Sequence, residues 1–196
     1  MWAFLILGGL FIIIVAVRVV HFFNLDKTNA QVAKIHNTKL TLDDVMGKNL
    51  PPDPGTEADK TVQGIDANNN GIRDDVELSV FKEYPNSAKT RAVLLQYALA
   101  LQMETIQPFM NTTIATETIR EEDRADYCIA DNLVPRKTPD SSRPYSDLEK
   151  IDIFLHFVEN NQFDTQKRKD ARTNFVKLVR SYSDLDQICD IDFSKL

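Results

Sequence analysis

The first 23 residues form an almost unbroken run of apolar side chains. Residues 2–17 are apolar throughout, and the run continues beyond Arg18 as far as Phe23. A helix that crosses the hydrocarbon core of a membrane needs about 20 such residues, and Arg18 can extend its guanidinium to the membrane surface. The pattern predicts a transmembrane anchor over residues 1–23.

Two other interpretations of this run fit less well. A buried core helix is one alternative, since a helix that is apolar on every face has no solvent side. A cleaved signal peptide is the other, but no basic residue precedes Trp2, and the sequence HFFNLD that follows the run lacks small residues. We therefore expect an uncleaved, single-pass anchor.

The pattern changes at residue 24. Residues 24–63 are polar and aperiodic, with the proline-rich stretch PPDPG at 51–55, in which proline removes backbone donors and glycine permits a turn. We interpret residues 24–63 as a polar linker or stalk that contains one short helix over residues 29–36.

The rest of the chain, residues 64–196, has helical periodicity. A stretch dense in helix formers begins at Ser87 and ends at Pro108, and apolar residues recur at spacings of three and four over 148–158 and 171–182. No glycine follows Gly71, which argues against hairpin-rich β folds and glycine-rich phosphate loops. We predict a mainly α protein, whose domain 64–196 is a small bundle of four or five helices.

The charge and the cysteines limit the possible partners and location. The net charge is −6, and because Arg18 is the only charged residue before Asp26, the remainder carries about −7, which disfavours nucleic acid as a partner. Cys128 and Cys189 are the only cysteines. Two cysteines that follow a membrane anchor can pair, which favours a disulfide and a domain outside the cytoplasm. Two reduced, buried thiols remain the alternative, and basic residues after the anchor favour the opposite orientation.

The densest group of oxygen-bearing side chains is GIDANNNGIRDDVE, residues 64–77. Counted as a twelve-residue loop, residues 66–77 place side-chain oxygens at positions 1, 3, 5, 9 and 12, with Gly71 at position 6, where a sharp bend is needed. Calcium binds six to eight oxygens, and alternate residues of a curled backbone can supply them. The candidate ligands are Asp66, Asn68, Asn70, the carbonyl of Ile72, Asp74 and Glu77. The alternative is an Asn-Gly turn that precedes an acidic helix start.

This spacing resembles the calcium loop of the EF-hand superfamily, because every ligand position fits D-x-[DN]-x-[DN]-G-x₅-E. The resemblance covers about a dozen residues and departs from paired EF-hands at Arg73, where an aliphatic residue is usual, and in the segment before Gly64, which does not predict an entering helix. It is closer to the single loops of thrombospondin type 3 and dockerin repeats. The loop is also similar to one in bacterial envelope proteins of unassigned activity.

The candidate side-chain ligands are three carboxylates and two neutral amides, so we expect modest calcium affinity, with a Kd of about 10⁻⁴ to 10⁻³ M, as in extracellular modules. Such a site fills outside the cytoplasm, and the bound ion stabilises the fold.

Other charged clusters give weaker signals. An acidic run (Glu121, Glu122, Asp123 and Asp126) and a basic run (Lys167, Arg168, Lys169 and Arg172) are both expected to be solvated helix faces. The histidines His21, His36 and His156 are far apart in the sequence, and no nucleophile–base pair can be named.

The expected function is that of a calcium-binding protein anchored in a bacterial inner membrane, with a periplasmic helical domain that binds a partner, such as another envelope protein. We expect binding rather than catalysis. The alternative is an envelope hydrolase with acidic catalytic residues and a structural calcium ion.

Overall fold

The protein is described by a computed structural model that covers residues 2–138, 141–185 and 187–196, with side chains from Ile6 onward. The elements are α1 (Trp2–Asn37), α2 (Leu42–Val45), η1 (Gly55–Asp59), α3 (Asp74–Glu83), α4 (Ala88–Ile106), α5 (Thr112–Leu133), α6 (Tyr145–Gln162), α7 (Gln166–Val176) and η2 (Phe193–Lys195). No β-strand occurs within these ranges, and the prediction of a mainly α protein is confirmed.

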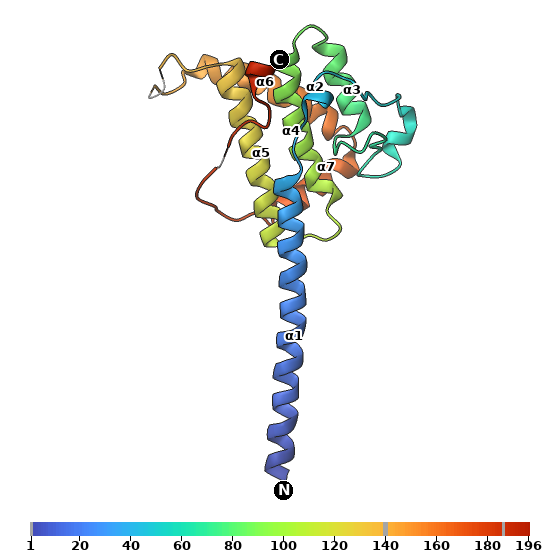
Figure 1. Ribbon diagram of the computed structural model, residues 1–196, viewed down its shortest axis with the longest axis vertical. Helices are drawn as coiled ribbons and strands as arrows, with labels where there is room; N and C mark the ends of the chain where they lie inside the picture. The colour runs from blue at the N-terminus through green and yellow to red at the C-terminus, as the bar shows by residue number, and fades with distance from the viewer. Residues whose placement is uncertain (1, 139–140, 186) are drawn as a thin grey trace.

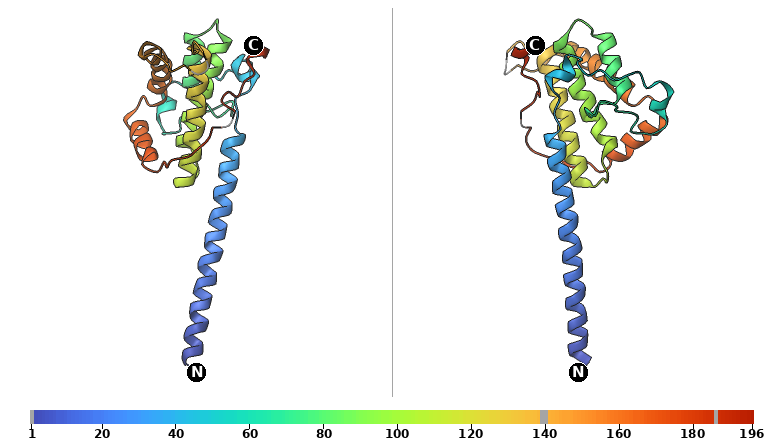
Figure 2. Two further views of the ribbon diagram at one scale, coloured as in Figure 1. Left: turned by 90° about the vertical axis from the view of Figure 1, so that its left-hand side faces the viewer. Right: turned by 45° about the vertical axis from the view of Figure 1, so that its right-hand side comes forward.

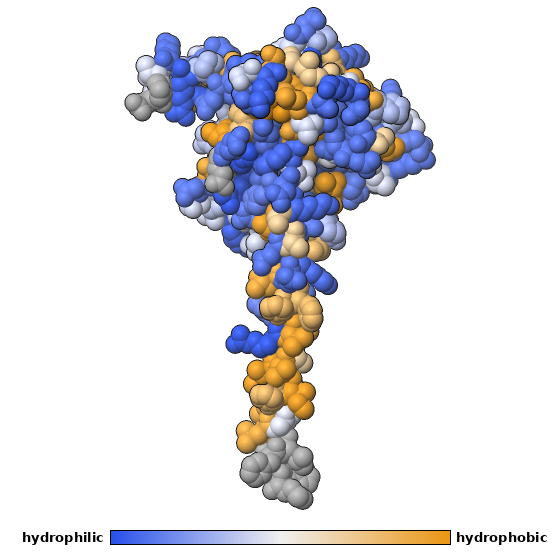
Figure 3. Space-filling model, in the orientation of Figure 1, coloured by the Kyte–Doolittle hydropathy of each residue, from blue (hydrophilic) through white to orange (hydrophobic). Residues whose placement is uncertain are grey.

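Helix α1 is a stalk that projects from a bundle formed by the other helices (Figure 1). Its large apolar side chains between Ile6 and Leu25 are exposed, and they give the lower stalk a mostly apolar surface (Figure 3). The stalk is long and apolar enough to cross a membrane, with a mean hydropathy of 2.5 over the qualifying stretch. None of that stretch is buried, so the alternative of a core helix is wrong.

Helix α1 does not end at the predicted boundary of residue 23. It continues to Asn37 because residues 24–37 contain neither proline nor glycine and pack, through Thr28 and Ile35, against the bundle. Helix α5 is its main neighbour. The short helix expected over residues 29–36 is therefore the last part of the stalk.

Residues 38–63 also differ from the expected free linker. Leu40, Val45 and Ala58 are buried, and Thr41 forms a capping box with Asp44 that starts the short helix α2. The apolar residues of this segment lie too far apart to form a periodic pattern. The sequence therefore indicated a linker where the chain in fact covers the bundle.

Helix α4 is the centre of the bundle. It starts after the capping residue Ser87, as predicted, and ends two residues before Pro108. Every residue from Arg91 to Glu104 is buried, because α2, α3, α5, α6 and α7 all pack against α4 (Figure 2). A helix that is covered on every side in this way has no face exposed to solvent.

The C-terminal segment after α7 returns along α5. Helix α7 ends at Val176, earlier than the periodicity up to residue 182 indicated. Further along, the sulfur atoms of Cys128, in α5, and Cys189 are 2.07 Å apart, which is disulfide distance. The cysteine pair thus connects the C-terminal segment to the bundle core, where Cys128 is fully buried.

Candidate metal centre

Loop 66–77 lies between the turn η1 and helix α3, on the side of the bundle (Figure 1, cyan to green). Residues 60–73 contain no helix, whereas α3 begins at Asp74. The chain thus runs from the 3-10 helix η1 through an irregular segment into α3.

Polar side chains curl the backbone of this loop. The Asp66 carboxylate accepts hydrogen bonds from the backbone nitrogens of Asn70, at 3.1 Å, and Gly71, at 2.9 Å. Asn70 Oδ1 accepts another from the backbone nitrogen of Ile72, at 2.9 Å. Gly71 has φ +86°, and a Cβ there would lie 2.7 Å from Leu99. Glycine is therefore needed at this position for both conformation and space.

Two residues fix the loop to the bundle. Ile72 is fully buried in the core, and so is the side chain of Arg73. Arg73 donates to the backbone carbonyls of Asn161, at 2.6 Å, and Gln162, at 2.9 Å, at the end of α6. A guanidinium suits this position because the last carbonyls of a helix lack partners and carry partial negative charge. Arg73, which departs from the EF-hand pattern, thus docks the loop.

Asp74 and Glu77 are each only 1% exposed. Burial raises the pKa of Glu77 to about 7, although a hydrogen bond from Asn68 (3.1 Å) opposes this increase. Burial also raises the pKa of Asp74, against the effect of a backbone hydrogen bond from Ala67, and the charge of Asp66 adds to the increase. No lysine or arginine among the described residues forms an ion pair with these three carboxylates.

The residues of the loop fit a calcium ion in number and type of donor. No group of three or more His, Cys, Asp or Glu side chains in the described part of the chain meets the geometry of a metal site. The donor number is reached only with the amide oxygens of Asn68 and Asn70 and the carbonyl of Ile72. Asn70 Nδ2 is buried without a hydrogen-bond partner, and a rotation of this amide exchanges its nitrogen for its oxygen.

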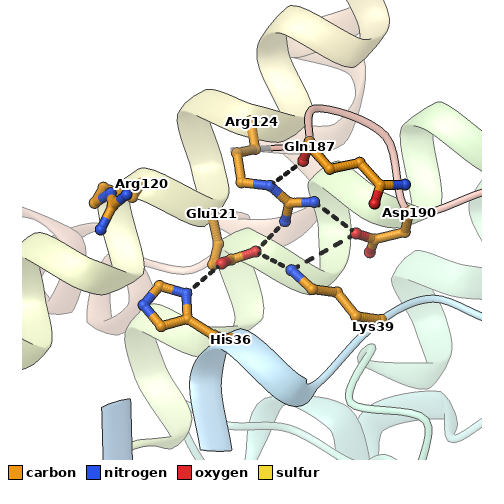
Figure 4. Close-up of a pocket in the computed structure, with 7 residues that line it drawn as sticks. All are labelled: His36, Lys39, Arg120, Glu121, Arg124, Gln187 and Asp190. Atoms are coloured by element: carbon orange, nitrogen blue, oxygen red, sulfur yellow. Dashed lines mark hydrogen bonds and ion pairs between the residues drawn. The ribbon is translucent and has the colours of Figure 1, made fainter. Parts of the chain in front are cut away.

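A second group of polar and charged side chains, partly buried, joins the stalk to the bundle, and we call it the stalk network: His36, Lys39, Glu121, Arg124 and Asp190 (Figure 4). Glu121 accepts hydrogen bonds from Lys39, at 2.8 Å, and from Arg124, and it contacts His36 Nδ1 at 2.7 Å. Asp190 pairs with Arg124 at 3.0 Å. These side chains line a cavity of about 230 Å³ together with Arg120 and Gln187.

The electrostatics of the stalk network are opposite to those of the loop. Burial tends to raise the pKa of Glu121, but hydrogen bonds from Lys39 and His36 and the charge of Arg124 outweigh it, so the pKa lies below its usual value. The carboxylate is therefore stable in its charged form inside the protein. Sequence reasoning missed this network because Lys39 and His36 lie 82 and 85 residues from Glu121 in the sequence.

The acidic and basic runs are not the solvated faces that were predicted. Glu121, Glu122 and Arg168 are buried, although Lys167 and Lys169 are exposed as expected. Arg168 is 1% exposed and bonds the backbone around η1, including Val62 O at 3.1 Å. The pattern misled because both runs lie on helices whose inward faces carry charge that pairs across the bundle.

Glu104 and Glu122 form the most deeply buried acid pair near α4. Arg172 lies between them and donates to both, and the hydroxyl of Tyr97 donates to Glu122 at 3.4 Å. Burial and the charge of Glu122 together raise the pKa of Glu104 well above its usual value. Arg172 partly neutralises this pair, which is therefore unlike an uncompensated catalytic dyad.

Comparison of the chain with models of known protein families, with curated proteins and with solved structures found no match, so its own residues carry the functional conclusion.

Proposed function

We propose that this protein is a single-pass membrane protein with an extracytoplasmic helical domain, in which loop 66–77 binds a calcium ion that stabilises the domain. Asp66, Asn68, Asn70, Asp74 and Glu77 supply side-chain oxygens, and Ile72 supplies its carbonyl. The ion has a structural role, and the bundle binds a partner at the membrane.

The observation that carries this proposal is the burial of carboxylates without a compensating cation. Asp74 and Glu77 are buried in one short loop, and their pKa values are raised. Removing a charge from water costs free energy unless an opposite charge or hydrogen bonds compensate it. A divalent cation compensates these charges where the protein offers no lysine or arginine.

Location outside the cytoplasm is supported by two independent features. Cys128 and Cys189 lie at disulfide distance, and structural disulfides persist in oxidising compartments. A site with only three carboxylate ligands is expected to bind calcium with a Kd of about 10⁻⁴ to 10⁻³ M. Calcium at cytosolic concentrations does not fill such a site, whereas external calcium does. A bacterial periplasm, with the anchor in the inner membrane, meets both conditions.

A binding role is favoured over the hydrolase alternative. The hydrolase requires a carboxylate pair in a cleft with nothing to neutralise it. The buried pair Glu104 and Glu122 shares Arg172, and we assign the uncompensated carboxylates of Asp74 and Glu77 to the calcium ion. The first half of α6 instead exposes the apolar side chains of Tyr145, Leu148 and Ile153, which are available to a partner.

The test is thermal unfolding of the full-length protein in detergent micelles, with calcium titrated against a chelator. At 5 mM calcium, binding stabilises the folded state by about 1 to 2 kcal/mol, which raises Tm by about 3 to 8 °C for a chain of this size. Asp66→Ala is expected to abolish the increase.

A charge-matched control is Glu57→Ala, because Glu57 is exposed in η1 and pairs only with Lys60 at the surface. This variant should retain the full calcium response. An equal response in Asp66→Ala and the wild type, or none in the wild type, would reduce the loop to a capped turn.

A further inference from the structure

The connection between α4 and α5 carries exposed apolar side chains at one end of the bundle. Ile106 is 41% exposed and Phe109 is 38% exposed, and Met110 lies beside them. The segment 105–116 contains no charged residue, although 27% of the whole chain is charged. This end of the bundle is the one nearest to the lower stalk in both orientations (Figures 1 and 2).

Hydrogen bonds fix the position of this connection along the stalk. Asn111 Nδ2 donates to Thr28 Oγ1 at 3.0 Å, while Asn111 Oδ1 caps α5 by accepting from the backbone nitrogen of Ile114 at 2.9 Å. Gln31 donates to Gln107 one turn further along the stalk. Residues 107–111 therefore lie level with residues 28–31 of α1.

The rise per residue of α1 gives the distance of the α4–α5 connection from the hydrocarbon core of the membrane. Residues 2–23 span about 33 Å at 1.5 Å per residue, which matches a hydrocarbon core of about 30 Å. Thr28 follows Phe23 by five residues, or about 8 Å. The headgroup region on each face of a bilayer is about 5 to 8 Å thick. The part of the α4–α5 connection beside Thr28 thus lies at the outer edge of the headgroups, within reach of a large side chain.

We propose that Ile106 and Phe109 enter the interfacial region of the membrane that α1 spans and hold the domain against the bilayer, while Met110 anchors the connection on the core. We assign lipid as the occupant of this surface for two reasons. The surface lies beside the point where the stalk leaves the membrane, and its segment contains no charged residue that would favour contact with water. Aromatic and aliphatic side chains bind at the interface through their buried apolar area. This inference depends on the anchor in the proposed function.

A tryptophan reporter in the full-length protein tests this contact. Trp2 is the only tryptophan, so Trp2→Phe gives a silent background into which Phe109→Trp is introduced. The protein is reconstituted into phosphatidylcholine–phosphatidylglycerol vesicles, with lipids brominated near the headgroup as quenchers. The reporter at position 109 is expected to emit at shorter wavelength than free tryptophan in buffer. The brominated lipid is expected to quench most of its fluorescence.

The matched control is Tyr145→Trp in the same background. Tyr145 is 76% exposed at the start of α6, which lies at the end of the bundle away from the lower stalk (Figure 1). This reporter should not be quenched by brominated lipid. Ile106→Trp provides a second position on the proposed surface, in case the change at Phe109 disturbs folding.

Flotation of the vesicles separates failure of the anchor from failure of the contact. Protein that floats with the vesicles retains the anchor. If it floats and the reporters at positions 106 and 109 are quenched no more than that at 145, the membrane contact is wrong. A reporter shielded from iodide but not quenched by lipid would assign this surface to a protein partner and would equally overturn the proposal.

Discussion

Loop 66–77 and the stalk network both contain buried carboxylates, but the surroundings of these carboxylates differ. Glu121 has a lowered pKa whereas Glu77 has a raised one. The difference is the surrounding charge: Lys39 and Arg124 surround Glu121, while Glu77 is compensated only by the amides of Asn68 and Asn70 among the described residues. In one region the fold supplies the cation, and in the other we propose that a calcium ion provides it.

The largest expected effect is in the stalk network. Arg124→Ala leaves Glu121 and Asp190 with Lys39 as the only lysine or arginine paired with them among the described residues, and breaking a buried ion pair in this way costs about 3 kcal/mol. Urea unfolding in detergent measures this cost. Arg136→Ala removes the same side chain from an exposed position and should cost little. A loss below about 1 kcal/mol in Arg124→Ala would show that the network is well solvated.

Glu77→Gln should have opposite effects with and without calcium. The raised pKa of about 7 means that folded-state stability falls as the pH rises from about 4.5 to 7, because the folded protein holds the proton more tightly. The neutral glutamine removes this cost and should stabilise the ion-free protein by on the order of 2 kcal/mol at pH 8. The variant should also lose the calcium response.

Titration of unfolding with calcium and chelator at pH 8 checks both effects. Destabilisation of the chelated variant would mean that the Glu77 carboxylate is already compensated inside the protein, so that the two regions do not differ as stated.

Asp126 offers a third environment, in which neighbouring carboxylates outweigh a single arginine. Burial and the charges of Asp123 and Glu122 raise its pKa to about 6, although Arg143 opposes them. The folded state holds the proton more tightly, so stability falls as the pH rises from about 4 to 6. Asp126→Asn should therefore stabilise the protein by about 1 kcal/mol at pH 7, allowing for solvent screening.

Chemical unfolding between pH 4 and pH 8 tests this expectation. The gain should disappear near pH 4, and calcium should leave it unchanged, because no loop of oxygen donors surrounds Asp126. A gain that stays constant with pH would show that ionisation of Asp126 is not its cause.

The smallest effect is expected where both charges are solvated. Lys48 and Asp43 are 2.6 Å apart, but their side chains are 63% and 55% exposed. Lys48→Ala should change the unfolding free energy by at most about 0.5 kcal/mol. Thermal unfolding in low and high salt measures the change. A loss comparable to that of Arg124→Ala would break the link between burial and the strength of these ion pairs.

The sequence predicted the helical class, the apolar stalk and the loop because each has a local cause. Side-chain hydropathy sets the stalk between residues 2 and 23, and the spacing of Asp66, Asn70 and Gly71 sets the curl of the loop. Local patterns of this kind involve residues within a few positions of one another. The calcium ligands named from the sequence remain a proposal, since the structure shows their burial and hydrogen bonds without the ion.

The tertiary structure alone decided how charge is distributed inside the protein. Residues 24–63 looked like a linker and Arg168 like a surface residue, but both pack into the bundle. Lys39 meets Glu121 across 82 positions, and Leu40 meets Asp190 across 150. No local pattern encodes such pairs, because their stabilisation exists only when the fold brings the partners together and removes them from water.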